Sequence, residues 1–172
     1  MTTEFDHGSH QLQMLRCEPH TSNLYRPIEL AVRDMREANN RDLTTGVGAG
    51  NRSWIGLSLG MIVLDTLSGN DPKAWRRWRR LLTDHGISED DAKIVYAFRC
   101  SLLHGYGPPK PKESCDRKVL LTDDADTYAL DTSQTGRAIL SVPVFCGRLV
   151  ERIAAEVPND WDDSLIDTDY RM

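Results

Sequence analysis

Several features that would place a chain in a specialised class are absent from these 172 residues. The four cysteines form no CxxC pair and no zinc-ligand spacing, so we expect reduced thiols and no bound metal. Nothing else in the sequence indicates a cofactor. The most apolar run, residues 54–64, is too short to span a bilayer, which predicts no membrane contact. No signal peptide is recognisable at the amino end, and together these absences predict a cytoplasmic protein.

What remains is an ordinary composition, with 40% hydrophobic, 27% charged and 7% aromatic residues. Such values exclude a collagen, a coiled-coil rod and a broadly disordered chain. At roughly 100–200 residues per domain, the length predicts one soluble globular domain. A core of this size does not need disulfides or a structural metal for its stability.

The formal net charge of −5 comes entirely from one end of the chain. Residues 156–172 hold six acids and one base, whereas residues 1–155 hold 20 acids and 20 bases. The overall acidity therefore does not exclude a polyanionic partner for the folded part. We divide the chain into a loosely ordered segment at 1–22, a helical domain at 23–157 and an acidic tail at 158–172.

Apolar residues recur at steps of three and four in several segments, which predicts a mainly α protein built as an antiparallel helical bundle. The predicted helices cover residues 27–42, 53–67, 72–85, 88–104 and 141–156. The fourth has the clearest boundaries. Ser88 is its expected N-cap, Asp91 stands at the capping-box distance, and Gly105 is expected to supply the left-handed residue that ends it.

The pattern changes before the last helix. Short strand-like runs at 118–122, 127–130 and 138–142 are separated by clusters of turn residues. This spacing predicts a small antiparallel β-meander inserted at about 118–142.

Two residues of the fourth predicted helix, Arg99 and His104, are candidates for a catalytic pair. Arg99 lies in a strongly apolar segment, where a guanidinium must find an anionic or hydrogen-bonding partner because it cannot lose its proton. His104 lies at the end of the helix, where the helix dipole favours a protonated imidazole. Arginine can stabilise a phosphorane while histidine moves protons, so the pair suits phosphodiester cleavage. Five residues span about 140° on a helix, so we expect two chains to complete one site across a dimer axis.

Two other patterns compete with this pair. The same R-x4-H spacing recurs at Arg80 and His85, and chance alone predicts roughly half a match in a chain of this composition. We prefer Arg99 and His104 because Arg80 belongs to an exposed arginine cluster and His85 resembles a solvated helix end, but the second copy stays open. Residues 56–60 match the G-x-S-x-G pattern of serine hydrolases, yet no strand precedes them, so we expect helix packing there instead.

The stretch VYAFRCSLLHGYGPP resembles the motif helix of the HEPN superfamily (higher eukaryotes and prokaryotes nucleotide-binding domains). The resemblance implies a dimeric α-helical bundle acting as a metal-independent endoribonuclease, with Arg99 and His104 as the catalytic pair. It also implies a toxin or defence role with a cognate antitoxin. Cys100 stands where the family often has Asn, and non-catalytic members exist. The alternative is therefore a dimeric module that binds RNA or a nucleotide, or serves as an interaction partner, without cleaving.

We expect RNA to contact two basic stretches of the chain. The loop after His104 carries Tyr106, which can stack on a base or pack over the helix end, and the cations Lys110 and Lys112. The third predicted helix adds Arg76 and Arg80, which lie beside tryptophans expected in the core.

Overall fold

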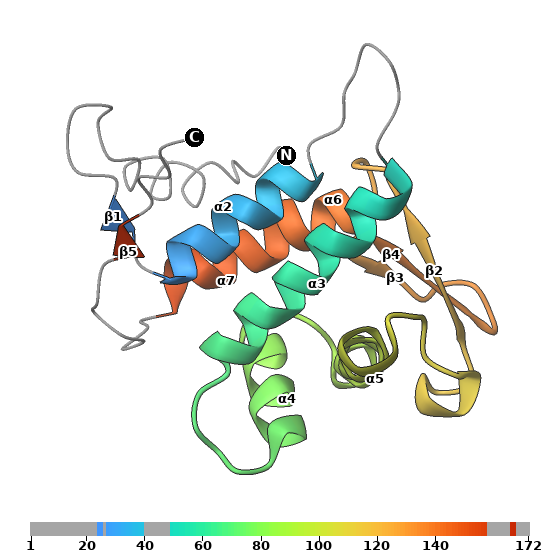
Figure 1. Cartoon of the computed structure of the whole chain (residues 1–172). Helices are drawn as coiled ribbons and strands as arrows, with labels where there is room; N and C mark the ends of the chain where they lie inside the picture. The colour runs from blue at the N-terminus through green and yellow to red at the C-terminus, as the bar shows by residue number, and fades with distance from the viewer. Residues whose placement is uncertain (1–23, 26, 40–48, 158–165, 168–172) are drawn as a thin grey trace, which may run out of the picture.

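Helices account for most of the residues that the structure describes. The computed structural model describes residues 24–25, 27–39, 49–157 and 166–167 (Figure 1). Within these ranges the chain is mainly helical with a small three-stranded sheet, as the apolar periodicity predicts for the helices. The predicted loose segment at 1–22 lies outside the described residues, as does the tail at 158–172 except for residues 166–167.

Helices α2 (Pro27–Asn39) and α3 (Ala49–Leu67) pack closely, and α7 (Glu151–Glu156) lies beside them (Figure 1). The predicted helix at 27–42 is confirmed to residue 39; its last three residues lie outside the described part. Gly60 allows the approach. A Cβ there would stand 3.3 Å from both Met35 Sδ and Cys146 Sγ. The small residues of this helix thus serve packing, as expected.

An ion pair joins the first and last of these helices. Arg36 donates to both carboxylate oxygens of Glu151, at 2.8 Å and 2.7 Å. The Glu151 side chain is only 11% exposed. The hydrogen bond to Glu151 raises the pKa of the Arg36 guanidinium. Burial acts in the opposite direction, and the negative charge of Glu151 adds to the increase. This contact fixes α2 on the carboxyl-terminal helix.

The predicted last helix contains an irregular centre. Ser141 is its N-cap, and the segment continues through α6 (Val142–Val144), the π-helix η2 (Phe145–Val150) and α7. Of the apolar side chains that the periodicity predicts for the core side, Phe145, Leu149 and Ile153 are buried and Val157 is only partly buried. A π-helix changes the number of residues per turn, a detail that the 3.6-residue periodicity does not reveal.

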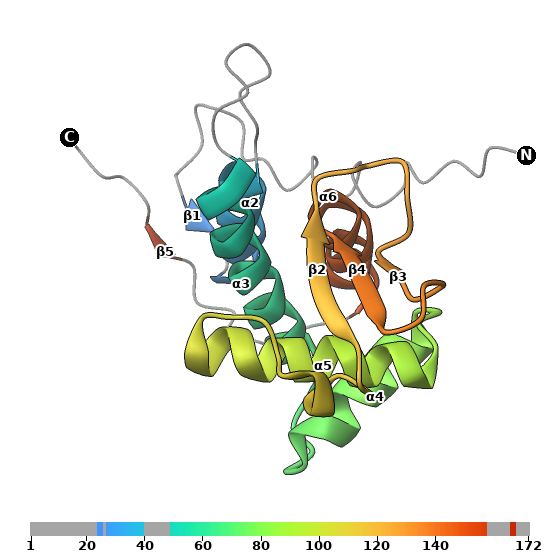
Figure 2. The ribbon, with the colours of Figure 1, turned by 90° about the vertical axis from the view of Figure 1, so that its right-hand side faces the viewer.

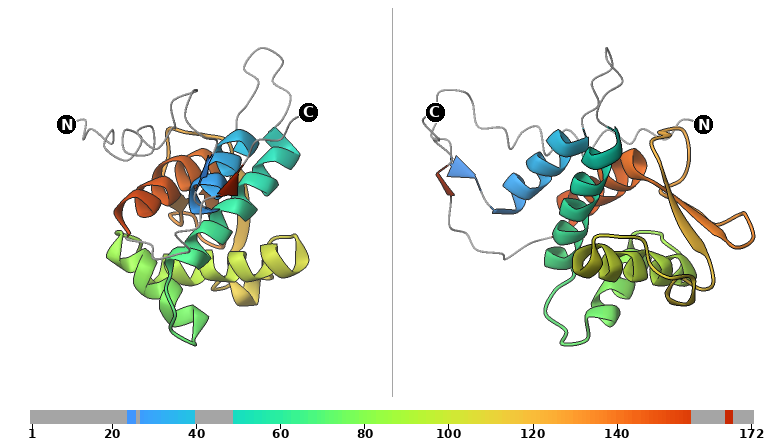
Figure 3. Two further views of the ribbon diagram at one scale, coloured as in Figure 1. Left: turned by 60° about the vertical axis from the view of Figure 1, so that its left-hand side comes forward. Right: turned by 45° about the vertical axis from the view of Figure 1, so that its right-hand side comes forward.

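Helices α4 (Ala74–Asp84) and α5 (Glu89–Gly105) form a second layer beneath α2, α3 and α7 (Figure 3). Ser88 caps α5 as predicted, with its Oγ accepting from the Asp91 N–H at 3.1 Å. The expected role of Gly105 is wrong. The left-handed residue that ends α5 is Tyr106, at φ 50°, and its N–H donates to the Leu102 carbonyl. The helix therefore continues one residue further than the glycine signal indicates.

The strands do not form the antiparallel meander that the turn clusters predict. Strands β2 (Lys118–Thr122), β3 (Leu130–Asp131) and β4 (Arg137–Ser141) are arranged in the order β2-β4-β3. β2 pairs with β4 in parallel, and only β3 is antiparallel to β4. Residues 123–136 form a connection long enough to return β4 in the same direction as β2, as parallel pairing requires.

A second, two-stranded pairing links the two ends of the described chain. β1 (Leu24–Tyr25) pairs antiparallel with β5 (Ile166–Asp167). Two residues of the acidic tail therefore have a defined partner near the start of the helical domain. Of the helices in the described ranges, none combines the length and the apolar character that crossing a membrane requires.

Candidate functional site

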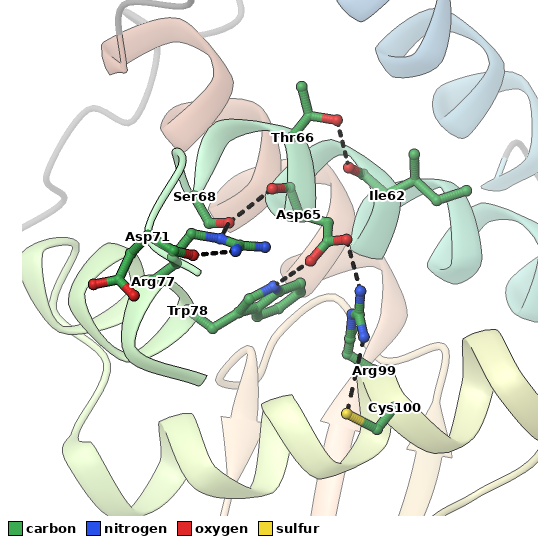
Figure 4. Close-up of polar contacts among 9 residues, drawn as sticks. All are labelled: Ile62, Asp65, Thr66, Ser68, Asp71, Arg77, Trp78, Arg99 and Cys100. Carbon is green, nitrogen blue, oxygen red and sulfur yellow. Dashed lines mark hydrogen bonds and ion pairs between the residues drawn. The ribbon is translucent and has the colours of Figure 1, made fainter. Parts of the chain in front are cut away.

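Arg99 is held by a carboxylate of a neighbouring helix. Its Nη2 donates to Asp65 Oδ2 at 2.6 Å, from the middle of α5 to the carboxyl-terminal part of α3 (Figure 4). The Arg99 side chain is 14% exposed and that of Asp65 30%. Burial opposes the charge of Arg99, but the hydrogen bond and the charge of Asp65 outweigh it and raise the pKa of the guanidinium. The expected anionic partner thus comes from within the same chain.

Asp65 also contacts a third helix, α4. Its Oδ1 accepts from Trp78 Nε1 at 2.7 Å, and Trp78 is fully buried (Figure 4). One carboxylate therefore joins α3, α4 and α5, and we call Asp65, Trp78 and Arg99 the Asp65 junction. The sequence interpretation missed this role. The one available signal was a lone acid that closes the most apolar run of the chain.

The junction does not use all the donors of Arg99. Its Nη1 lies 4.0 Å from the Cys100 sulfur, a weak acceptor. Its Nε is buried and has no hydrogen-bond partner among the described residues. Cys100 thus supports the guanidinium only weakly, at the position where the resembled family often has Asn.

His104 lies apart from Arg99. It is exposed at the carboxyl-terminal end of α5, and no hydrogen bond or ion pair with another described residue is found for its side chain. No hydrogen bond connects His104 to Arg99 in the described part of the chain. The expected separation of the two side chains on the helix is consistent with this arrangement. Whether a second chain completes the site stays a prediction.

Tyr106 packs over the helix end, which is one of the two roles considered for it; stacking on a base stays a prediction. Its ring packs on Trp54, with centroids 5.9 Å apart and planes at 38°, and Trp54 in turn contacts Phe98. Yet Tyr106 is 60% exposed. The aromatic ring thus stands next to His104 in the chain, supported from behind and open on its other side.

The two lysines of the following loop are exposed and lie away from this helix end. The chain after Tyr106 turns back along α5 to η1 (Pro111–Glu113), as Figure 2 shows. Lys110 begins η1, with its backbone N–H donating to Glu113 Oε2 at 3.0 Å, and Lys112 lies within it. They therefore do not gather around His104.

Arg76 and Arg80 are on a different surface, that of α4. This helix packs on α5 through Trp75 and Tyr96, whose rings are 5.3 Å apart, and through the ion pair of Arg79 with Glu89 at 3.1 Å. The structure therefore places the predicted RNA-binding residues in two groups, one on α4 and one at and after the end of α5.

In the second copy of the R-x4-H pattern, Arg80 and His85, the histidine is largely buried. The side chain of His85 is 12% exposed, contrary to the solvated end that the sequence indicates. Its Nδ1 lies 2.7 Å from the Leu81 carbonyl, and its Nε2 lies 3.5 Å from Glu156. Arg152 donates to the His85 carbonyl at 2.6 Å. His85 therefore joins the end of α4 to α7, whereas Arg80 is exposed.

The hydrolase pattern has no catalytic geometry. Ser58 lies inside α3, where its Oγ donates to the Trp54 carbonyl one turn earlier at 2.8 Å. A nucleophile elbow requires a strand before the serine and a strained turn around it. Among the described residues, no group of three or more His, Cys, Asp or Glu side chains is arranged to hold a metal ion.

The cysteines should differ sharply in reactivity. Burial raises the pKa of the Cys146 thiol to about 12, so it stays protonated at pH 8, whereas Cys115 is exposed. We expect iodoacetamide at pH 8 to label Cys115 within minutes and Cys146 only after unfolding in urea. Peptide mapping by mass spectrometry measures both. Equal labelling rates in the native protein would contradict the buried position of Cys146.

Comparisons with protein-family models, with curated proteins and with solved structures return no match to this chain. A function for the chain is therefore argued from two observed features. One is the Asp65 junction between the helical layers, and the other is the exposed His104 imidazole and Tyr106 ring at the end of α5.

Proposed function

We propose that this chain is a HEPN-like dimeric module that binds single-stranded RNA without cleaving it. The observation that supports the proposal best is the Asp65 junction. A guanidinium that catalyses phosphodiester cleavage must contact the phosphate, but Arg99 donates to Asp65 at 2.6 Å and is 14% exposed. In this proposal Arg99 is a structural residue.

The binding contact is assigned to the exposed end of α5. Tyr106 offers a ring face that is supported by Trp54, and base–aromatic stacking is worth about 1–3 kcal/mol per base. His104 supplies hydrogen-bonding groups next to it. Lys110 and Lys112 add exposed positive charge farther along the path of the RNA strand, beyond this helix end.

A second copy of the chain is the proposed partner. Ile55 and Ile62 lie seven positions apart on α3 and are 48% and 43% exposed. Leu59 lies between them on the same helix face and is only partly buried. Exposed apolar side chains of this kind are typical of protein–protein contacts. Sedimentation velocity tests the dimer, and a monomer at micromolar concentration would contradict this part of the proposal.

RNA binding and cleavage can be tested together with a labelled 15-nucleotide single strand in EDTA. We expect wild-type protein to bind the intact strand and Tyr106→Ala to bind about tenfold more weakly, since it loses a stacking contact. Tyr128→Ala is the matched control, because Tyr128 is 76% exposed on another part of the surface. It should bind like wild type. Equal losses in both variants, or no binding by wild type, would contradict the proposal.

Metal-independent endoribonuclease activity is the second candidate. It is favoured by the unpartnered Nε of Arg99 and by the unpaired, exposed side chain of His104. In that case the same assay would show strand cleavage by wild type and none by His104→Ala. No cleavage by either would leave the non-catalytic module as the function.

A further inference from the structure

Helix α4 carries four arginines within 11 residues, and the structure gives them different partners. Arg77 donates to the Asp71 carbonyl and, at 3.2 Å, to Ser68 Oγ. Arg79 pairs with Glu89. For the guanidinium groups of Arg76 and Arg80, no hydrogen bond or ion pair is found with any described residue, and both are exposed.

These four arginines surround one hollow in the surface. It has a volume of about 430 Å³, and its remaining lining comes from Asp71, Thr83 and Glu89. The guanidinium of Arg80 lies beside the turn at Gly69. Arg80 Nη2 is 3.9 Å from the position that a Cβ atom would take on Gly69, whose φ is +84°. Four guanidinium groups against two carboxylates leave the hollow positively charged.

Folding does not explain the two unpaired arginines. Residues four apart on a helix are neighbours, and like charges at this spacing destabilise the helix. The apolar side chains of α4, including Trp78, Leu81 and Leu82, are already buried without help from Arg76 or Arg80. Two neighbouring guanidinium groups with free donors match the successive phosphates of a nucleic-acid backbone.

We infer that the hollow on α4 binds the phosphate backbone of single-stranded RNA through Arg76 and Arg80. The inference rests on the proposed function and extends it, because it adds a backbone contact to the stacking contact at Tyr106. A membrane surface fits less well, since the apolar side chains of α4 are turned inward and none is free to enter a bilayer. A single strand also suits the proposed stacking at Tyr106, because its bases are not held in pairs.

The test compares Arg76→Gln/Arg80→Gln with Arg137→Gln/Arg148→Gln, a control that removes the same charge from exposed arginines on β4 and η2. We expect the α4 double variant to bind the 15-nucleotide strand more weakly and to lower the slope of log K against log salt by about 1.4, for two phosphate contacts. Its melting temperature should stay the same or rise. The control should keep the wild-type slope. Equal slopes in both double variants would overturn the inference.

Further arms separate this inference from the proposed function. Loss of RNA binding in Tyr106→Ala alone, with Arg76→Gln/Arg80→Gln binding like wild type, would overturn the α4 contact and keep the proposed function. The wild-type protein could bind inorganic tripolyphosphate through the α4 arginines and bind no RNA. That result would overturn the proposed function and would identify a free phosphate chain as the ligand of the hollow. Binding to phosphatidylserine vesicles and to neither of these ligands would overturn both.

Discussion

Replacing Asp65 by alanine is expected to lower the free energy of unfolding by about 3 kcal/mol. The change leaves the charge of Arg99 without its carboxylate partner and the buried Trp78 N–H without its acceptor. Removing one member of a buried ion pair costs more than the pair itself contributes, because the other charge stays in a poorly solvated place. Urea unfolding followed by tryptophan fluorescence measures the effect.

Two further variants show whether this loss comes from the junction. Asp90→Ala breaks the ion pair of Asp90 with Lys93 on the surface of α5 and should change stability little. Asp65→Ala/Arg99→Met should be more stable than Asp65→Ala alone, because the unpaired charge is gone. The double variant is also compared with the single variants Asp65→Ala and Arg99→Met. If the losses of stability in these two single variants add up to the loss in the double variant, Arg99 and Asp65 are not coupled, and the junction is not a structural element.

The same variants distinguish the two candidate functions. In the non-catalytic module, Arg99→Met changes stability but leaves RNA affinity unchanged under conditions where the protein stays folded. In a ribonuclease, the change abolishes cleavage even when the protein is fully folded. Circular dichroism at the assay temperature provides the check on folding.

Replacing Glu151 by alanine is expected to cost about 2 kcal/mol of stability. Arg36 makes two hydrogen bonds to this carboxylate, and the variant leaves its guanidinium, which is only 31% exposed, without either of them. Chemical denaturation of the purified variant measures the change.

Glu156→Ala is the matched control, since Glu156 lies on the same helix and is 56% exposed. It should lose far less stability than Glu151→Ala. Arg36→Met/Glu151→Ala should recover part of the loss, because no unpaired charge then remains. A loss of the same size in Glu156→Ala would show that the Arg36 contact does not fix α2 on α7.

Local signals predicted the helices well and the sheet poorly. The cap at Ser88 and the three-and-four spacing of apolar residues depend only on neighbours within a turn or two, so they are readable in the sequence. The direction of β4 relative to β2 depends on the path of residues 123–136, which turn composition does not specify. The choice of Tyr106 over Gly105 as the left-handed residue similarly depends on packing, since the tyrosine ring rests on Trp54.

The candidate site divides in the same way. The sequence placed Arg99 inside the fourth predicted helix, placed His104 and Tyr106 at its end, and marked Arg76 and Arg80 as cations beside core tryptophans. It also predicted that Arg99 and His104 lie on different sides of the helix, but not that Asp65 is the partner of Arg99 or that the basic residues form two separate surfaces. Those facts depend on how helices far apart in the chain pack together.

By itself, the sequence determined that Arg99 must have a partner, because a guanidinium in an apolar helix stays charged at every accessible pH. It also determined where the helix around Arg99 begins, since capping is a local interaction. Only the tertiary structure decided which group neutralises that charge. The carboxylate of Asp65, 34 positions away, reaches Arg99 because α3 and α5 are packed in separate layers that meet at this point. Such a contact has no local signature, and whether Arg99 is structural or catalytic depends on it.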